Sequence, residues 1–157
     1  MIREAKVKDV DAIVNLINIF AQKGIMLGVS KAYVYEHIRN YIVVEADGKI
    51  VGCGALRVHW ADMAEVRSLA VDPAYHKNGR GARIVTHLLH MAEEIGVEKV
   101  FALTMQVGFF KKLGFKEIKK EELPYKIWKD CINCPKYPNF CDEEAVIINL
   151  KDFKKEV

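Results

Sequence analysis

A glutamate and an arginine lie two residues apart in the otherwise apolar run MAEVRSLAV, residues 63–71. A carboxylate or a guanidinium is costly to bury without a partner or a task, so Glu65 and Arg67 are candidates for chemistry. A carboxylate can accept a proton as a general base, and a guanidinium can bind a carboxylate with two hydrogen bonds. The alternative is that the two side chains pair with other charges at the edge of a sheet.

A glycine loop follows this run, and its residue types suit an anion. Asp72-Pro73 ends the run, because proline has no N–H to donate to a sheet, and the loop HKNGRGA, residues 76–82, leads into an amphipathic helix. Glycine lets the backbone approach a ligand closely, and the N-terminus of a helix favours negative charge. Neither a P-loop nor a G-x-G-x-x-G pattern is present. The loop therefore predicts an anion site, the alternative being a plain helix start.

The length and composition predict one domain over residues 1–157, since the chain has 157 residues of which 51% are hydrophobic. The net charge of +3 is small and the signs are interspersed, which gives no case for nucleic acid or a membrane as partner. The N-terminal residues carry charges throughout and have no signal-peptide pattern, and no apolar run approaches about 18 residues. We expect a soluble, cytoplasmic protein.

The hydrophobic pattern predicts alternating strands and helices around this central run. Asp47-Gly48 separates two β-branched runs and indicates a hairpin. Helices are expected after Asp9, which is a plausible N-cap, after Ser30, after the glycine loop up to Ile95, and near Phe109. Strands are expected at residues 2–5, 41–46, 49–59, 63–71, 99–105, 115–118 and 145–150. The fold class is α/β, with a mixed central sheet and helices on both of its faces.

The glycine loop, following a strand of the type SLAVDP, resembles the pyrophosphate loop of the GCN5-related N-acetyltransferase (GNAT) family, Gln/Arg-x-x-Gly-x-Gly/Ala. AEVRSLAV, FALT and FFKKLGF occur together at the separations of that family, so the resemblance covers nearly the whole chain. It is similar to the short, stand-alone N-acetylglutamate synthase type. The resemblance implies the acetyltransferase fold, acetyl-CoA as cosubstrate, and transfer of acetyl to the α-amine of an amino acid, L-glutamate, in arginine biosynthesis.

The resemblance also assigns roles to residues. Glu65 and Thr104 match positions associated with proton handling in the glutamate-acetylating family. Phe110 occupies the position where many acetyltransferases have a tyrosine that protonates the leaving thiolate, so Thr104, water or another tyrosine must take that role, or the thiolate leaves unprotonated. Phe110 then packs along the cofactor or in the core. The expected contacts to coenzyme A are Leu69, Ala70, Val71, His76, Lys77, Asn78, Gly79, Arg80, Gly81, Ala82 and Phe110.

The substrate site departs from the family pattern at Val29, which stands before Ser30 where the family has an arginine that clamps the substrate carboxylate. Three other cations are candidates for binding that carboxylate: Arg67, Lys126 and Lys136.

A cysteine cluster near the C-terminus leaves three interpretations open. Cys131, Cys134 and Cys141 supply three of the four ligands that structural zinc needs, unless Asp142, a histidine or Cys53 joins them. The alternatives are a redox pair of Cys131 and Cys134, or buried packing. We expect no metal.

Two other functions compete with acetylation of an amino acid. One is acetylation of another small amine or of a protein N-terminus. The other is a non-catalytic module that senses acetyl-CoA, an interpretation motivated by Phe110 and Val29. A homodimer is the commonest assembly for such soluble proteins.

Overall fold

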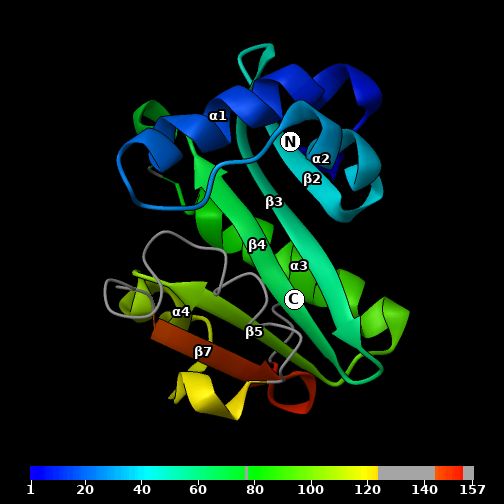
Figure 1. Ribbon diagram of the computed structural model, residues 1–157, viewed down its shortest axis with the longest axis vertical. Coiled ribbons are helices and arrows are strands. Elements are labelled where there is room, and N and C mark those ends of the chain that lie inside the picture. Colours follow the sequence, from blue (N-terminus) through cyan, green and yellow to red (C-terminus); the bar gives the residue numbers. More distant parts are fainter. Residues whose placement is uncertain (77, 124–143, 154–157) are drawn as a thin grey trace. The chain divides into compact units, whose positions relative to one another are not determined.

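The computed structural model describes residues 1–76, 78–123 and 144–153, and hydrogen bonds join its seven strands in the order β1-β2-β3-β4-β5-β7-β6 (Figure 1). The strands are β1 (Ile2–Glu4), β2 (Tyr41–Ala46), β3 (Lys49–Trp60), β4 (Met63–Val71), β5 (Lys99–Thr104), β6 (Lys116–Ile118) and β7 (Glu144–Asn149). The α-helices are α1 (Val10–Gln22), α2 (Lys31–Glu36), α3 (Arg80–Ile95) and α4 (Val107–Lys112). β4 and β5 are parallel, while β1–β2, β2–β3, β5–β7 and β6–β7 are antiparallel. The expected mixed sheet is confirmed.

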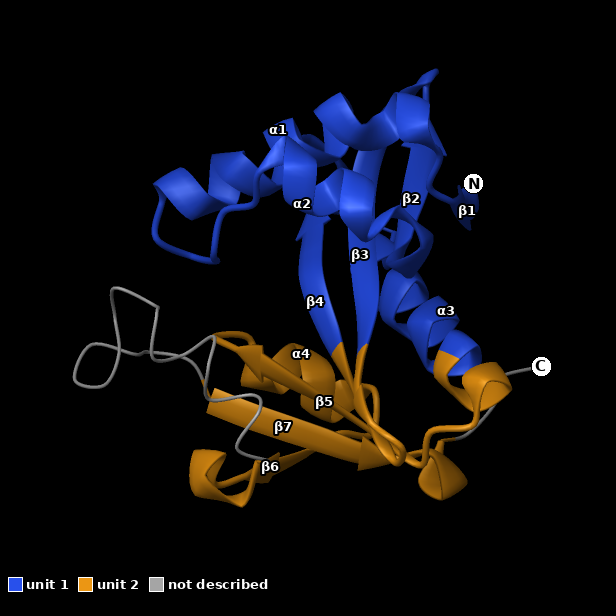
Figure 2. Cartoon of the chain, turned by 45° about the vertical axis from the view of Figure 1, so that its right-hand side comes forward, with its two compact units in different colours: residues 1–57, 66–91 blue, residues 58–65, 92–157 orange. Residues whose placement is uncertain are grey.

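The chain forms two compact units, which Figure 2 colours separately. Unit 1 contains residues 1–57 and 66–91, and unit 2 contains residues 58–65 and 92–157. No helix among the described residues combines the length and apolar character needed to cross a membrane.

Unit 1 has helices on both faces of its strands (Figure 2). One face carries a core formed with α1 and α2, whose buried residues are Val10, Ile13, Val14, Leu16, Ile17, Val34, Tyr41, Val43, Cys53, Ala55 and Ala70. On the other face, α3 packs directly over Gly52 and Gly54: a Cβ placed on these residues would lie 3.2 Å and 2.6 Å from the side chain of Ile84. The absence of side chains at these two positions is what lets α3 lie close to β3.

The hairpin turn and one helix cap of this unit lie where the sequence predicted them. Asp47 and Gly48 both adopt positive φ, 54° and 75°, as the predicted Asp-Gly hairpin turn requires. Ser30 caps α2, since its Oγ accepts a hydrogen bond from the Tyr33 N–H at 3.0 Å. The helix itself ends at Glu36 and is followed by a 3₁₀ turn at Ile38–Asn40.

Asp9 precedes α1 as predicted, but its side chain does not cap that helix. The carboxylate accepts hydrogen bonds from Arg3 Nη1 and Nη2 at 2.7 and 3.0 Å, and from the Lys6 N–H at 2.8 Å. Arg3 also donates from Nε to Glu45 Oε1 at 2.7 Å. The hydrogen bonds from Arg3 are the largest cause that lowers the pKa of Asp9, against the desolvation that raises it. A charged partner from β1 has thus displaced the local cap.

Unit 2 has two separate apolar groups. The first buries Met63, Phe101, Leu123 and Ala145, with Leu103, Ile118 and Ile147 packed against them. The aromatic residues of α4 and the segment after it form a separate group, in which Phe110 meets Phe109 and Phe115 edge to face at 5.1 and 5.0 Å between ring centroids.

Several element ends differ from the predictions. β5 ends at Thr104 rather than at Met105, which is 41% exposed, and α4 begins at Val107, before Phe109. Ile95, the last residue of the predicted apolar stripe on α3, is 59% exposed. All of these residues lie at or next to the ends of elements, where helices fray and boundaries commonly vary by one or two residues.

We expect the substitution Gly54→Ala to destabilise the protein by about 1–3 kcal/mol, because the new methyl group overpacks against Ile84 Cγ2 at 2.6 Å and Leu88 Cδ1 at 3.2 Å. Urea denaturation measures the change. Gly108→Ala is the matched control: its Cβ would have no neighbour within 4 Å, and alanine suits a helix better than glycine. Equal midpoints for the two variants would contradict close packing of α3 on β3.

Candidate active site

In unit 1, β4 ends in the predicted Asp-Pro turn. Asp72 Oδ1 accepts a hydrogen bond from the Ala74 N–H at 2.9 Å and so caps a 3₁₀ turn, Pro73–Tyr75. His76 follows: its Nε2 lies 2.6 Å from the Val71 carbonyl oxygen, and its ring stacks on Phe20 with centroids 6.3 Å apart. The His76 side chain therefore contacts the strand end and α1.

The loop that starts α3 has the backbone expected of an anion site. Asn78 and Gly79 adopt consecutive positive φ angles of 76° and 67°, and the Gly79 carbonyl accepts the first helical bond, from the Arg83 N–H at 3.0 Å. The N–H groups of residues 80–82 precede that bond and are directed along the helix axis toward the loop. A Cβ at Gly79 would have nothing within 4 Å, so the approach to this backbone is open. Lys77 lies outside the described residues.

Tyr75 ties this loop to the β2–β3 turn. Its hydroxyl donates to Asp47 Oδ2 at 3.0 Å, and its ring has Lys49 Nζ at 5.1 Å and the Arg80 guanidinium at 5.4 Å. Arg80 Nη1 also donates to the Tyr75 carbonyl at 3.3 Å. Tyr75 was not among the residues predicted from the sequence, although an aromatic residue inside a polar loop was a usable signal.

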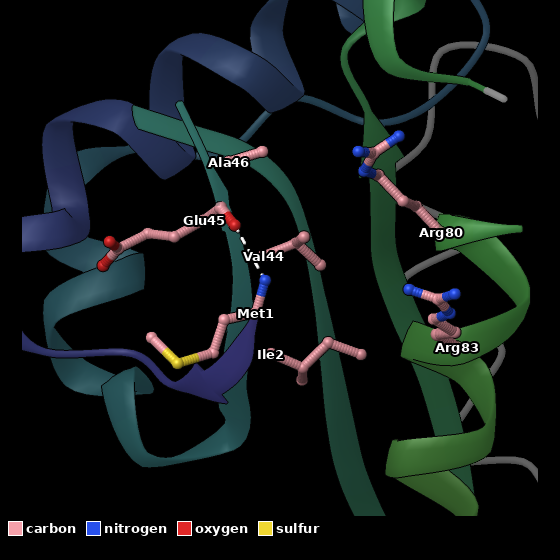
Figure 3. A pocket seen from close by; sticks show the side chains of 7 residues that line it. All are labelled: Met1, Ile2, Val44, Glu45, Ala46, Arg80 and Arg83. Atoms are coloured by element: carbon pink, nitrogen blue, oxygen red, sulfur yellow. Dashed lines mark hydrogen bonds between the residues drawn. The ribbon is translucent and has the colours of Figure 1, made fainter. Parts of the chain in front are cut away.

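Two arginines from the first turns of α3 line a small pocket of about 100 Å³ (Figure 3). Arg80 and Arg83 face β1 and β2, and the remaining lining residues are Met1, Ile2, Val44, Glu45 and Ala46. Positive charge beside a helix N-terminus favours an anionic ligand. Arg83 was missed from sequence because it lies one helical turn past the loop.

The part of β4 that belongs to unit 1 contains a break in the strand geometry at Ser68, whose φ is 55°. Its hydroxyl lies 3.3 Å from the Tyr41 hydroxyl, and its carbonyl accepts from Cys53 Sγ at 3.4 Å. Burial raises the pKa of Tyr41 to about 12, against smaller lowering by Ser68 and the charge of Arg67, and burial likewise raises the pKa of the Cys53 thiol to about 12. Neither group can ionise near neutral pH.

The two residues that follow this break face different layers. Leu69 packs toward the α3 side, with its Cδ1 3.7 Å from a Cβ built on Gly54, while Ala70 belongs to the core with α1 and α2. Ala70 and Val71 are buried, at 4% and 8% exposure. We therefore expect Ala70 and Val71 to contact a cofactor through their backbone, whereas the half-buried Leu69 can also use its side chain.

In unit 2, Glu65 is paired with His59, a residue that was not predicted from the sequence to belong to the site. His59 Nε2 lies 2.7 Å from Glu65 Oε1, and the exposures of the two side chains are 6% and 10%. The His59 ring lies 5.5 Å from the ring of Phe101. The sequence did contain a signal for this pair. His59 and Glu65 lie on either side of the short turn Ala61-Asp62, which joins β3 to β4.

The sheet register separates the two residues expected to handle protons. Glu65 pairs with Phe101 on β5, so these two side chains share a face, whereas Thr104 has the opposite parity on the same unbroken strand and faces the other side. Thr104 Oγ1 accepts a hydrogen bond from the Gln106 N–H at 2.8 Å, at the start of α4. Its role in proton handling stays a prediction, as does contact between the buried Phe110 and a cofactor.

The other predicted ligand residues are only partly placed. Arg67 is half-buried on β4, and the Val29 N–H donates to Asn18 Oδ1 at 3.4 Å in the loop between α1 and α2. Lys126, Lys136, Cys131, Cys134 and Cys141 lie outside the described residues. Among the residues that are described, no three histidines, cysteines or acids gather as a metal site would require.

Comparison with known proteins places this chain among enzymes. The model of the Acetyltransferase (GNAT) family matches residues 17–115. An uncharacterized N-acetyltransferase of Chlorobaculum tepidum is 42% identical over 149 residues, which are 95% of this chain and 96% of that protein. An amino-acid acetyltransferase of Mycobacterium tuberculosis is 41% identical over 121 residues, 75% of this chain and 69% of that one.

A solved structure shares the fold. The N-acetylglutamate synthase of Neisseria gonorrhoeae, complexed with coenzyme A and N-acetyl-glutamate, has a TM-score of 0.86 and 32% identity. The match covers 96% of this chain but 35% of that longer one.

We expect Gly79→Val to abolish acetyl-CoA binding, because a β-branched residue disfavours the φ of 67° and its side chain occupies the open approach to the loop. Isothermal titration calorimetry measures the affinity. Gly96→Val is the control, since Gly96 also has positive φ, 100°, and no neighbour within 4 Å, but follows the other end of α3. Unchanged affinity in Gly79→Val, or equal losses in both variants, would contradict the assignment of the loop.

Proposed function

The chain belongs to the acetyltransferase (GNAT) family, and from that premise we propose that it transfers the acetyl group of acetyl-CoA to the α-amine of an amino acid, with L-glutamate as the substrate. The product, N-acetyl-L-glutamate, would enter arginine biosynthesis in the cytoplasm. The observation that carries the proposal is the strand end, left-handed Asn78-Gly79 pair and helix N-terminus, an arrangement suited to the pyrophosphate of coenzyme A. The relatives named amino-acid acetyltransferase support the amino acid as acceptor.

The residues present fit a phosphate-bearing cosubstrate. Backbone N–H groups at the start of α3 would hold the pyrophosphate, and Arg80 and Arg83 add positive charge beside them. Tyr75 would keep the loop in place through Asp47 and Arg80. We propose Arg67 as the group that binds the substrate carboxylate in place of the arginine absent at Val29.

The proposed chemistry is direct transfer. The neutral amine attacks the thioester carbonyl, the C–N bond forms and the C–S bond breaks, and the amine loses a proton. We assign that proton to Glu65, because its carboxylate is buried on β4 in a defined hydrogen bond. Phe110 cannot protonate the thiolate, since it has no hydroxyl.

Incubating the protein with acetyl-CoA carrying a labelled acetyl group and a panel of amino acids tests the substrate. We expect label in N-acetyl-L-glutamate and little in other products. Label in a different amine or in a peptide N-terminus would replace glutamate as the substrate. Binding of acetyl-CoA without any labelled product would instead support a sensing role.

We expect Glu65→Gln to lower kcat by about 10²–10⁴-fold, because glutamine keeps the shape of the side chain and cannot accept the proton. The affinity for acetyl-CoA should change little. Steady-state kinetics, with chemistry shown to limit turnover, provide the measurement, and Glu94→Gln, an exposed position on α3, is the control. An undiminished kcat in Glu65→Gln would remove this residue from the mechanism.

A further inference from the structure

We propose that His59 is the positioning residue for Glu65: it holds the carboxylate in the orientation in which that group accepts the proton of the amine. The inference rests on the proposed function for its catalytic meaning. The contact on which it depends lies entirely within unit 2.

The proposed role of Glu65 fixes the direction of the hydrogen bond between the two residues. A carboxylate that is to accept a proton must be ionised, and an ionised carboxylate only accepts hydrogen bonds, so the hydrogen in the 2.7 Å contact belongs to His59 Nε2. Such a charge-assisted bond is among the stronger ones in proteins. A carboxylate has about four acceptor sites, so it can hold His59 and still take up the proton of a substrate.

The burial of the pair separates it from an ordinary surface contact. The His59 and Glu65 side chains are 6% and 10% exposed, whereas the neighbours of His59 on β3, Val58 and Trp60, are 48% and 59% exposed. Alternation along β3 has thus turned the histidine inward and two apolar residues outward. A surface ion pair contributes little, whereas removing a donor from a desolvated carboxylate is costly.

Both members of the pair lie beside the same buried residue. Phe101 is fully buried, its ring lies 5.5 Å from the His59 ring, and its backbone pairs with Glu65 in the sheet register. The imidazole therefore has restricted freedom before it meets the carboxylate. A positioning group benefits from this restriction, because an imidazole that is already ordered loses less conformational entropy when it binds and orients the carboxylate.

Two substitutions separate positioning from a structural role. His59→Phe keeps a ring against Phe101 and removes the donor, so we expect kcat to fall about tenfold to hundredfold while KM for acetyl-CoA stays unchanged. His59→Gln places an amide N–H near Nε2 and should restore kcat to within a few-fold. His87→Gln on α3 is the control for losing a histidine. The proposal is wrong if the kcat of His59→Gln is as low as that of His59→Phe. It is also wrong if the loss appears in KM for acetyl-CoA rather than in kcat.

The double variant tests whether His59 acts through Glu65. In the Glu65→Gln background, His59→Phe should change kcat by less than twofold, because the group that it positions is already inactive. A full tenfold to hundredfold loss in that background would show that the two residues act independently and would overturn the proposal.

A measurement without turnover distinguishes failure of this inference from failure of the proposed function. In long-range ¹H–¹⁵N spectra of the wild-type protein, the signals absent from His59→Gln identify the His59 ring, and we expect its hydrogen on Nε2. A ring with hydrogen on Nδ1 alone overturns the inference whatever the activity. Hydrogen on Nε2 together with no acetylated amino acid supports the contact and rejects the proposed function.

Discussion

The close approach of α3 to β3 is the constraint on which the proposed anion site of unit 1 depends. Gly52 and Gly54 leave no side chains between the helix and the strand, and Ile84 fills the space. Because a helix is rigid, its position on β3 also places its first turn, where Arg80, Arg83 and the N–H groups of the loop are found. The proposed recognition of a phosphate group at this turn therefore depends on apolar packing about one helical turn further along α3.

The geometry of β4 changes along its length, between the stretch that contains Glu65 and the stretch that leads to the glycine loop. The stretch in unit 2 keeps regular pairing with β5 and buries Glu65 against His59 and Phe101. The stretch in unit 1 has positive φ at Ser68, held through contacts with Tyr41 and Cys53. A non-glycine residue in this conformation costs on the order of 1–3 kcal/mol, and such strain often accompanies functional sites. The Tyr41 and Cys53 side chains are buried and neutral, so they hold this backbone without adding charge.

The parts of the fold that depend on local patterns were predictable from sequence. Asp47-Gly48, Ser30 and the run Met63–Val71 all specify their structure within a few neighbouring residues, and the structure agrees. The failures involve partners that belong to different elements, although they are only six residues apart in the chain. Asp9 was expected to cap α1, but Arg3 competes for its carboxylate, and the contact of His59 with Glu65 depends on how two strands align, which residue types do not determine. The same applies to the opposite faces of Glu65 and Thr104.

The pair of Arg3 and Asp9 makes the stability of the fold a function of acidity. Hydrogen bonds from Arg3 lower the pKa of Asp9 in the folded protein, whereas in the unfolded chain the residue titrates at about 3.9. Unfolding in the interval between these two values takes up a proton, so stability decreases there as the pH falls. The contribution of the pair is complete above the unfolded value and is lost once the pH passes below the folded one. Low pH therefore destabilises unit 1 at the junction of β1 with α1, where Arg3 and Asp9 form their pair.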